Sequence, residues 1–284
     1  MKRYISLVKF AHTIFAMPFA LMAFTYALWS TEAEFSWWLL LQVLLCMVFA
    51  RNVAMGFNRW ADRDIDAANP RTANREIPAG KISPRNAMIF VVVNAILFMA
   101  TACTINLLTA ILSPVALAVI MFYSYCKRFT ALAHIVLGLS LAIAPAGAFI
   151  AVTGTLTWEV CLLSLLVLTW CGGFDIIYAL QDAEFDRKRG LHSIPSRFSV
   201  ATSLYISIAL HCVSVVALVG FALNLPQSWV LWCGVALFTA ILVAEHILVT
   251  PTRQRSIGIV FGTLNGLASL TLAAFVIANI LIFG

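Results

Sequence analysis

Two pairs of aspartates with the same spacing are the residues best suited to do chemistry in this sequence. Asp62 and Asp66 stand four residues apart, and Asp182 and Asp186 repeat that spacing 120 residues later. On a helix, residues four apart lie on one face, where two like charges repel each other unless a cation lies between them. Two such pairs on separate helices predict a site where two hard divalent cations face each other.

Basic side chains flank both pairs. They are Arg71, Arg75, Lys127, Arg128, Lys188, Arg189 and Arg197. Magnesium prefers oxygen ligands and usually shares its coordination shell with substrate phosphates. Carboxylates that bind cations, beside basic groups that bind phosphate oxygens, predict a diphosphate site. The sequence contains no glycine-rich phosphate loop, so it gives no indication of ATP hydrolysis.

Composition predicts that membrane-spanning helices position these residues. Of the 284 residues, 62% are hydrophobic and 11% charged, against about 45–50% and about 25% in soluble domains. This excludes a soluble enzyme, a disordered protein and a disulfide-stapled secreted domain. Apolar runs long enough to cross a bilayer are expected at 10–30, 37–57, 87–106, 109–126, 131–152, 158–178, 201–223, 229–250 and 257–282.

The basic residues fall on alternate loops of this nine-helix arrangement. All 18 Lys and Arg residues, Arg51 included, lie toward one end, and the loops near 31–36, 107–112, 153–157 and 224–228 hold none. Loops rich in Lys and Arg stay in the cytoplasm. We predict a multi-pass protein of the cell inner (cytoplasmic) membrane with the N-terminus and active site in the cytoplasm and the C-terminus outside. The net charge of +6 therefore reflects topology rather than nucleic-acid binding.

The shared spacing also predicts an internal repeat. Four apolar runs separate the two motifs, so both copies point the same way, as in a parallel repeat. We expect one all-α integral-membrane domain, 1–284, with repeats at about 1–128 and 129–252 and a ninth helix at about 257–282. A diphosphate site at the mouth of an apolar bundle predicts a substrate with an apolar tail, a polyprenyl diphosphate. The lipid bilayer surrounds the predicted helices, and the sequence indicates no protein partner.

Two hypotheses from other classes compete with an enzyme. A secondary transporter also uses repeats and intramembrane acids, but it predicts ionisable groups near the middle of the bilayer. Here eight of the twelve acidic residues cluster at one end of the predicted helices. A structural or lipid-binding scaffold gives no reason for two aspartate pairs in register. The pattern favours the enzyme.

Three stretches of the sequence resemble signatures of the UbiA-type intramembrane aromatic prenyltransferases, which include the 4-hydroxybenzoate polyprenyltransferases. The stretches are 58–78, 123–130 and 175–195. The resemblance extends over nearly the whole chain, and that family has nine transmembrane helices, in agreement with the number of apolar runs. It implies Mg²⁺-dependent transfer of a polyprenyl group from polyprenyl diphosphate to an aromatic ring.

The resemblance also implies a role for individual residues. Mg²⁺ would be held by Asn58, Asp62, Asp66, Asp182 and Asp186. The diphosphate would be bound by Asn58, Arg71, Arg75 and Lys127. Lys127 is also a candidate catalytic residue because it would neutralise the leaving group, and Asp175 and Tyr178 would orient the acceptor or stabilise the allylic cation. Arg51 would bind an acceptor carboxylate or serve only as a topology charge.

The acceptor that we predict as the first choice is 4-hydroxybenzoate, which is prenylated in quinone biosynthesis. The alternative is 1,4-dihydroxy-6-naphthoate, used in the futalosine route to menaquinone. The stretch 9–20 lacks the L-D-R-P-type segment of many 4-hydroxybenzoate enzymes and looks more like members assigned to the futalosine route. Three histidines, His134, His211 and His246, are interpreted as structural.

Overall fold

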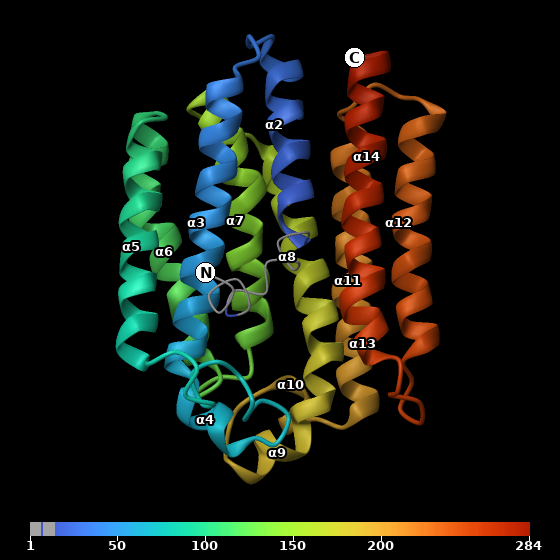
Figure 1. The fold of residues 1–284 in the computed structure, drawn as a ribbon. Coiled ribbons are helices and arrows are strands. Elements are labelled where there is room, and N and C mark those ends of the chain that lie inside the picture. The colour runs from blue at the N-terminus through green and yellow to red at the C-terminus, as the bar shows by residue number, and fades with distance from the viewer. Residues whose placement is uncertain (1–6, 8–14) are drawn as a thin grey trace.

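Long apolar helices make up most of the computed structural model, which describes Leu7 and residues 15–284 (Figure 1). The long helices are α2 (Met17–Thr31), α3 (Trp37–Ala61), α5 (Pro84–Cys103), α6 (Leu107–Cys126), α7 (Ala133–Thr153), α8 (Trp158–Ala179), α11 (Val200–Ala222), α12 (Trp229–Leu248) and α14 (Asn265–Phe283). Short segments connect them: α4 (Arg63–Ala68), η2 (Leu180–Asp182), α9 (Ala183–Lys188), α10 (Ile194–Arg197), α13 (Ile257–Ile259) and the π-helix η3 (Val260–Leu264).

Eight helices in the described part of the chain are long and apolar enough to cross a membrane. The first predicted run, 10–30, corresponds to α2, whose 15 described residues fall short of the ~20 needed to span a bilayer. Positions 8–14, which include His12 and much of the stretch 9–20, lie outside the described residues. The all-α, multi-pass membrane fold is confirmed, and the count of nine spans stays a prediction.

Polar capping residues begin many of the long helices. Side chains that accept a hydrogen bond from a backbone N–H three residues ahead are Ser36, Ser83, Asn106, Ser199 and Ser228. Each cap satisfies one of the donors that the first turn of a helix leaves free. The caps therefore set where these apolar runs become helices, within a few residues of the predicted starts.

Helix α8 lies in the interior of the bundle, where α7 and α11 pack along it. Its Trp170 is fully buried against Phe19 and Phe238, whereas large apolar side chains such as Trp37 and Trp229 are exposed at the outer surface. An apolar exterior around a packed interior is the arrangement expected of helices surrounded by lipid. Burial of α8 gives a rigid support to the aspartate motif that follows it.

Gly138 allows α7 and α8 to approach closely. A Cβ added at this position would lie 2.1 Å from the backbone carbonyl oxygen of Leu168, and backbone cannot move aside as a side chain can. We expect Gly138→Ala to lower the stability of the protein by about 1–3 kcal/mol. Gly147→Ala is the matched control on the same helix, because nothing lies within 4 Å of its added Cβ. Thermal unfolding in detergent would test this, and equal melting temperatures for the two variants would contradict it.

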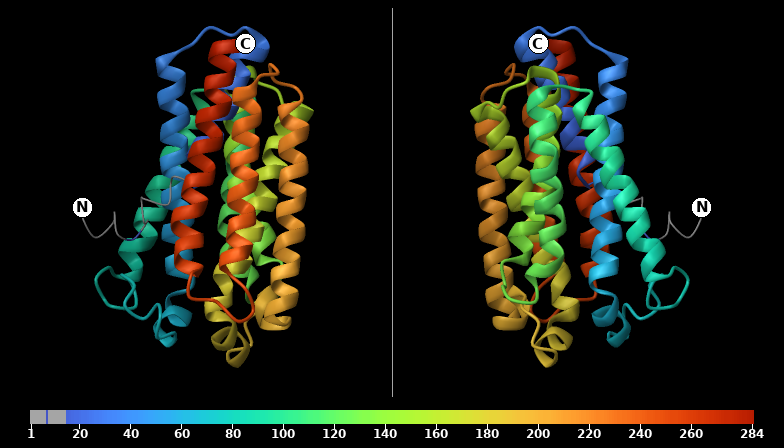
Figure 2. Two further views of the ribbon diagram at one scale, coloured as in Figure 1. Left: turned by 90° about the vertical axis from the view of Figure 1, so that its right-hand side faces the viewer. Right: turned by 90° about the vertical axis from the view of Figure 1, so that its left-hand side faces the viewer.

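The short segments gather at one end of the bundle, which we call the aspartate end (Figures 1 and 2). The connections from α3 to α5, from α6 to α7, from α8 to α11 and from α12 to α14 all lie there (Figure 1). Every Lys and Arg from Arg59 onward lies in or next to one of these connections. The predicted segregation of basic residues is therefore present in the described part of the chain.

Candidate active site

The first aspartate of each pair lies at a break between two helical segments. Asp62 separates α3 from α4, with φ −93° and ψ 4°. Asp182 ends η2 just before α9, with φ −107° and ψ 0°. The Asp66 N–H still donates to the Asp62 carbonyl oxygen at 2.8 Å, so one helical turn joins the first pair across the break. The two motifs thus share a backbone conformation as well as a spacing.

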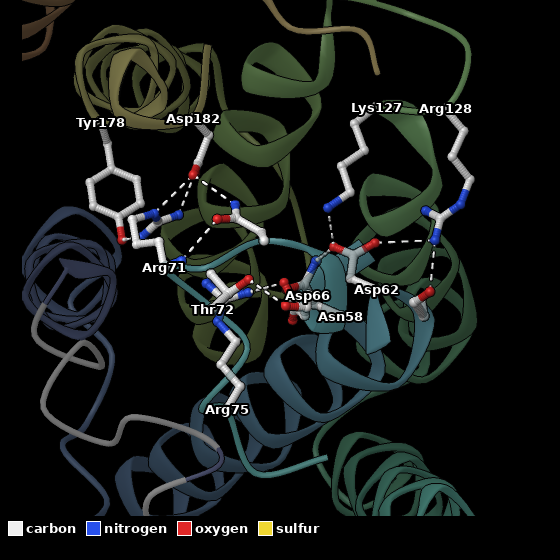
Figure 3. Close-up of polar contacts among 12 residues, drawn as sticks. Asn58, Asp62, Asp66, Arg71, Thr72, Arg75, Lys127, Arg128, Tyr178 and Asp182 are labelled. Carbon is white, nitrogen blue, oxygen red and sulfur yellow. Dashed lines mark hydrogen bonds and ion pairs between the residues drawn. The ribbon is translucent and has the colours of Figure 1, made fainter. Parts of the chain in front are cut away.

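Asp62 is the centre of the first group of contacts (Figure 3). Its side chain is buried, and Lys127 Nζ lies 2.5 Å from its Oδ2. Arg128 Nη2 lies 3.2 Å from its Oδ1, and the Asn58 side-chain amide donates to Oδ2 at 3.2 Å. The structure therefore brings Asn58, Asp62 and Lys127 together with Arg128, one of the basic residues that the sequence places beside the pairs.

Asp66 forms the second contact group together with the loop that follows α4. Arg75 Nη1 donates to Asp66 Oδ1 at 2.6 Å. The hydroxyl of Thr72 donates to the Asp66 backbone carbonyl at 3.1 Å, which holds the loop against α4. Asp66 Oδ2 is buried and has no hydrogen-bond partner among the described residues. A buried carboxylate oxygen without a partner is rare and costly, and it is a ready ligand for a cation.

Asp182 joins the two motifs (Figure 3). The Arg71 guanidinium donates to both carboxylate oxygens of Asp182, from Nε at 2.9 Å and from Nη2, and its Nη1 donates to the Tyr178 hydroxyl at 2.9 Å. The Asn69 amide donates to Asp182 Oδ1 at 3.0 Å. Because Asn69 and Arg71 follow the first motif in the chain, these contacts connect residues more than 100 positions apart.

Pairing with Asp182 keeps the Arg71 guanidinium positively charged. Burial lowers the pKa of the Arg71 guanidinium, but the hydrogen bonds and charge of Asp182, together with Tyr178, more than offset it. The pKa of Arg71 therefore lies above its ordinary value. Arg71 remains a cation that can also bind phosphate oxygens, since a guanidinium has five N–H donors in a planar array.

Asp186 is held by a turn, and in the part of the chain that the structure describes it forms no ion pair. The Ser193 hydroxyl donates to Asp186 Oδ2 at 3.1 Å. Ser193 also caps α10 and forms a capping box with Ser196, in which each side chain accepts from the backbone N–H of the other. Satisfying both N–H groups stabilises this turn, and the Ser193 hydroxyl anchors one oxygen of Asp186 to it.

A cavity of about 290 Å³ extends from these groups into the bundle. Asn58 and Tyr178 line it beside the aspartates, and Arg51 and Asp175 also line it. Along α3 the lining reaches from Asn58 back to Val43, a distance of about 22 Å at the rise of an α-helix. Apolar members of the lining include Cys46, Met47, Ala50, Leu137, Leu141, Ile143, Ala144, Ala148 and Ala151. This elongated apolar space suits a hydrocarbon chain whose charged end stays at the aspartates.

Arg51 is a cation without a carboxylate partner in this cavity. Among the described residues it makes no ion pair, and its Nε is buried without a hydrogen-bond partner. An unpaired charge in apolar surroundings is expensive. The arrangement therefore favours an anionic group of a ligand at Arg51 over a charge that serves topology alone.

Two contacts near the site were not expected from the sequence. Asn69, three residues after Asp66, donates to Asp182 of the second motif. Its position inside the stretch 58–78 is the sequence feature that could have indicated a role in the site. His134, interpreted as structural, places its Nδ1 2.7 Å from Asp175 Oδ2. Nothing in the sequence links these two residues, because they are 41 positions apart on different helices.

Comparison with known proteins places these features in a family. The model of the UbiA prenyltransferase family matches residues 16–270. The chain belongs to the UbiA prenyltransferase family. It is a prenyltransferase, and this membership favours the enzyme over the transporter and scaffold hypotheses.

Relatives and solved structures agree with this membership. The 4-hydroxybenzoate octaprenyltransferase of Tolumonas auensis is 32% identical over 206 residues, 72% of each chain, and that of Yersinia enterocolitica is 32% identical over 76% of this chain and 73% of its own. The apo structure of a UbiA homologue from Aeropyrum pernix has a TM-score of 0.80 at 29% identity, covering 95% of this chain and 97% of its own. A UbiA homologue from Archaeoglobus fulgidus bound to GPP and Mg²⁺ has a TM-score of 0.77 at 20% identity, covering 99% and 100% of the two chains.

Proposed function

We propose that this prenyltransferase transfers a polyprenyl group from polyprenyl diphosphate to 4-hydroxybenzoate in quinone biosynthesis. The observation that carries the proposal is one cavity whose lining includes Asn58, Arg75 and Tyr178, which contact Asp62, Asp66 and Arg71. The same cavity has apolar walls and contains Arg51, which makes no ion pair among the described residues. The mouth suits a diphosphate, the walls suit a prenyl chain and Arg51 suits the carboxylate of a small aromatic acid. The named activity of the relatives from Tolumonas auensis and Yersinia enterocolitica supports this acceptor.

The donor groups at the mouth have the chemistry that Mg²⁺ prefers, although in the described part of the chain no three carboxylates lie together as a preformed metal site. Mg²⁺ commonly takes one or two carboxylates and completes its shell with waters and substrate phosphates. The residues that would hold it are Asn58, Asp62, Asp66, Asp182 and Asp186. Oδ2 of Asp66, which has no partner in the described part of the chain, is an available ligand. Bound Mg²⁺ would neutralise charge on the diphosphate leaving group. The UbiA homologue from Archaeoglobus fulgidus was solved with GPP and Mg²⁺, which supports this choice of metal.

Basic side chains at the mouth would bind the diphosphate. Lys127, Arg71 and Arg75 contact the carboxylates of Asp62, Asp182 and Asp66. An ammonium and two guanidinium groups have further N–H donors for phosphate oxygens. As the carbon–oxygen bond to the prenyl group breaks, its electron pair leaves with the diphosphate, and these cations stabilise the developing charge. Lys127 acts as a catalytic residue in this step.

Aromatic rings and Asp175 would act on the other fragment, the allylic cation. Tyr178 stacks on Phe261 with 4.1 Å between ring centroids, and both rings line the cavity with Phe174. Aromatic faces attract cations, so these rings can stabilise the cation until an acceptor ring carbon forms the new carbon–carbon bond. That carbon then loses its proton. Asp175 and Tyr178 orient the acceptor for this attack.

The proposed orientation follows the distribution of charge. We place the chain in the cell inner (cytoplasmic) membrane with the N-terminus and the aspartate end in the cytoplasm and the C-terminus outside. The basic residues of the aspartate-end loops support this orientation, because loops rich in Lys and Arg are retained on the cytoplasmic side. Water-soluble acceptors and the diphosphate would then reach the site from the cytoplasm.

A transfer assay tests the proposed function. The purified protein in nanodiscs is given a labelled polyprenyl diphosphate and Mg²⁺, with 4-hydroxybenzoate or 1,4-dihydroxy-6-naphthoate offered separately. We expect labelled product from 4-hydroxybenzoate, its loss when EDTA removes the metal, and its return when Mg²⁺ is added in excess.

Each other outcome has a definite meaning. Product from the naphthoate alone would overturn the choice of acceptor and favour the menaquinone route. Product formation that persists in EDTA would overturn the metal proposal. A folded protein that bound the labelled diphosphate but formed neither product would contradict both acceptors.

A further inference from the structure

His134 lies where the cavity and the second aspartate motif meet. It belongs to the first turn of α7 and is buried. Its Nδ1 lies 2.7 Å from Oδ2 of Asp175, which lines the cavity. Its Nε2 accepts a hydrogen bond from the backbone N–H of Ile194 at 3.4 Å. One imidazole ring thus contacts a carboxylate at the cavity on one side and the start of α10 on the other.

These two hydrogen bonds define the tautomer of His134. A backbone N–H can only donate, so Nε2 carries its lone pair toward Ile194. The proton of the neutral ring is then on Nδ1, and it points at Asp175. In a neutral histidine, the hydrogen bond made by one ring nitrogen determines whether the other nitrogen carries the proton. The backbone of α10 therefore makes His134 a donor to Asp175.

The same network continues to the aspartate motif. Ile194 directly follows Ser193, whose hydroxyl donates to Asp186 Oδ2 at 3.1 Å. The capping box with Ser196 holds this turn in place. A continuous path of hydrogen bonds and one peptide unit therefore runs from Asp175 through His134 to Asp186.

Asp175 keeps a free side toward the cavity. Its side chain is 15% exposed, and among the described residues only its Oδ2 has a polar partner. Tyr178, one helical turn further along α8, lines the same cavity, as does Arg51 from α3. Oδ1 of Asp175 is therefore available to an acceptor whose carboxylate is bound by Arg51.

We propose that His134 is a positioning residue that holds the Asp175 carboxylate toward the acceptor and at a set position relative to Asp186. This inference rests on the proposed function. Asp175 touches the acceptor, and His134 acts through Asp175. Loss of the Nδ1 donor leaves the carboxylate free to rotate out of place, so it impairs the acceptor half of the reaction and leaves diphosphate binding intact.

Two substitutions at this position separate its two hydrogen bonds. The amide of His134→Asn can occupy the place of Nδ1 and still donate to Asp175. The longer side chain of His134→Gln reaches the place of Nε2, accepts from Ile194 and lacks the donor near Asp175. His246→Gln is the matched control, because His246 contacts His211 and does not line the cavity.

The measured quantities are kcat and acceptor KM for prenyl transfer and the Kd of the labelled polyprenyl diphosphate with Mg²⁺. We expect His134→Gln to lower kcat/KM for the acceptor by about 10–100-fold, by analogy with the cost of losing a residue that orients a metal ligand. The diphosphate Kd should stay at the wild-type value. His134→Asn should recover a large part of the loss, and His246→Gln should match the wild type.

Other results would overturn the inference. Wild-type kinetics in His134→Gln would show that the contact does not position Asp175. Equal losses in both His134 variants, or a parallel loss of diphosphate binding, would show a structural role instead. Failure of the proposed function is distinguishable, because the wild-type protein itself would then transfer no prenyl group to either acceptor.

Discussion

Replacing Asp182 by asparagine is expected to reduce kcat/KM for prenyl transfer by about 10²–10³-fold, the usual cost of removing one group that stabilises transition-state charge. Asparagine has nearly the same shape but no charge, so it weakens metal binding and leaves Arg71 without its carboxylate. Asp62→Asn should cause a loss of similar size, because Asp62 pairs with Lys127 and Arg128. The Mg²⁺ concentration that gives half-maximal activity should also rise in both variants.

The control is a third aspartate in the same region. Asp64 lies on α4 between the two motif aspartates, and its side chain is 85% exposed. Its one ion pair within the described residues is with Arg63, at 3.7 Å. An exposed pair of this kind contributes little, so Asp64→Asn should keep wild-type activity. Rates measured across a Mg²⁺ titration, with melting temperatures for each variant, test the prediction. Wild-type kcat/KM in Asp182→Asn at limiting Mg²⁺ would refute the role of this residue.

Replacing Arg51 by methionine is expected to raise the KM for 4-hydroxybenzoate by about 10²-fold, in line with the loss of one partner from a buried charge pair. Methionine fills a similar space without the charge. The effect should depend on the acceptor carboxylate, so an acceptor whose carboxylate is replaced by a carboxamide should lose little on the same substitution. Stability should not fall, because Arg51 is an unpaired cation in apolar surroundings within the described structure.

A competition assay decides between the two interpretations of Arg51. The wild type and Arg51→Met are each given a mixture of the carboxylate acceptor and its carboxamide analogue, and the two products are compared. A change in preference from the carboxylate toward the carboxamide in Arg51→Met shows that Arg51 binds the acceptor. Unchanged preference, with altered insertion of the protein in the membrane, would identify Arg51 as a topology charge. The 4-hydroxybenzoate and naphthoate candidates both carry a carboxylate. This experiment therefore tests whether Arg51 binds the carboxylate, and the transfer assay shows which aromatic ring is prenylated.

The membrane architecture could be predicted to a large extent because the bilayer imposes a length on every span. The predicted run 229–250 corresponds to Trp229–Leu248, and 201–223 corresponds to Val200–Ala222. The end of the bundle at which the basic loops lie was predictable because charges are costly inside the hydrocarbon. Arg51, which lies within α3 and lines the cavity, is the exception. The division into two repeats stays a prediction, although Asp62 and Asp182 share a backbone conformation.

Residue type and spacing predicted that the aspartate pairs and the nearby basic residues lie close together, while the individual contacts among them could not be predicted. The aspartate pairs and the basic residues near them are local patterns, and their chemistry follows from the groups themselves. Which cation pairs with which carboxylate depends on how helices pack. Asn69 and Asp182 are 113 positions apart, and His134 and Asp175 are 41 apart. Only the folded bundle, in which α3, α7 and α8 surround one cavity, brings such residues within hydrogen-bond distance.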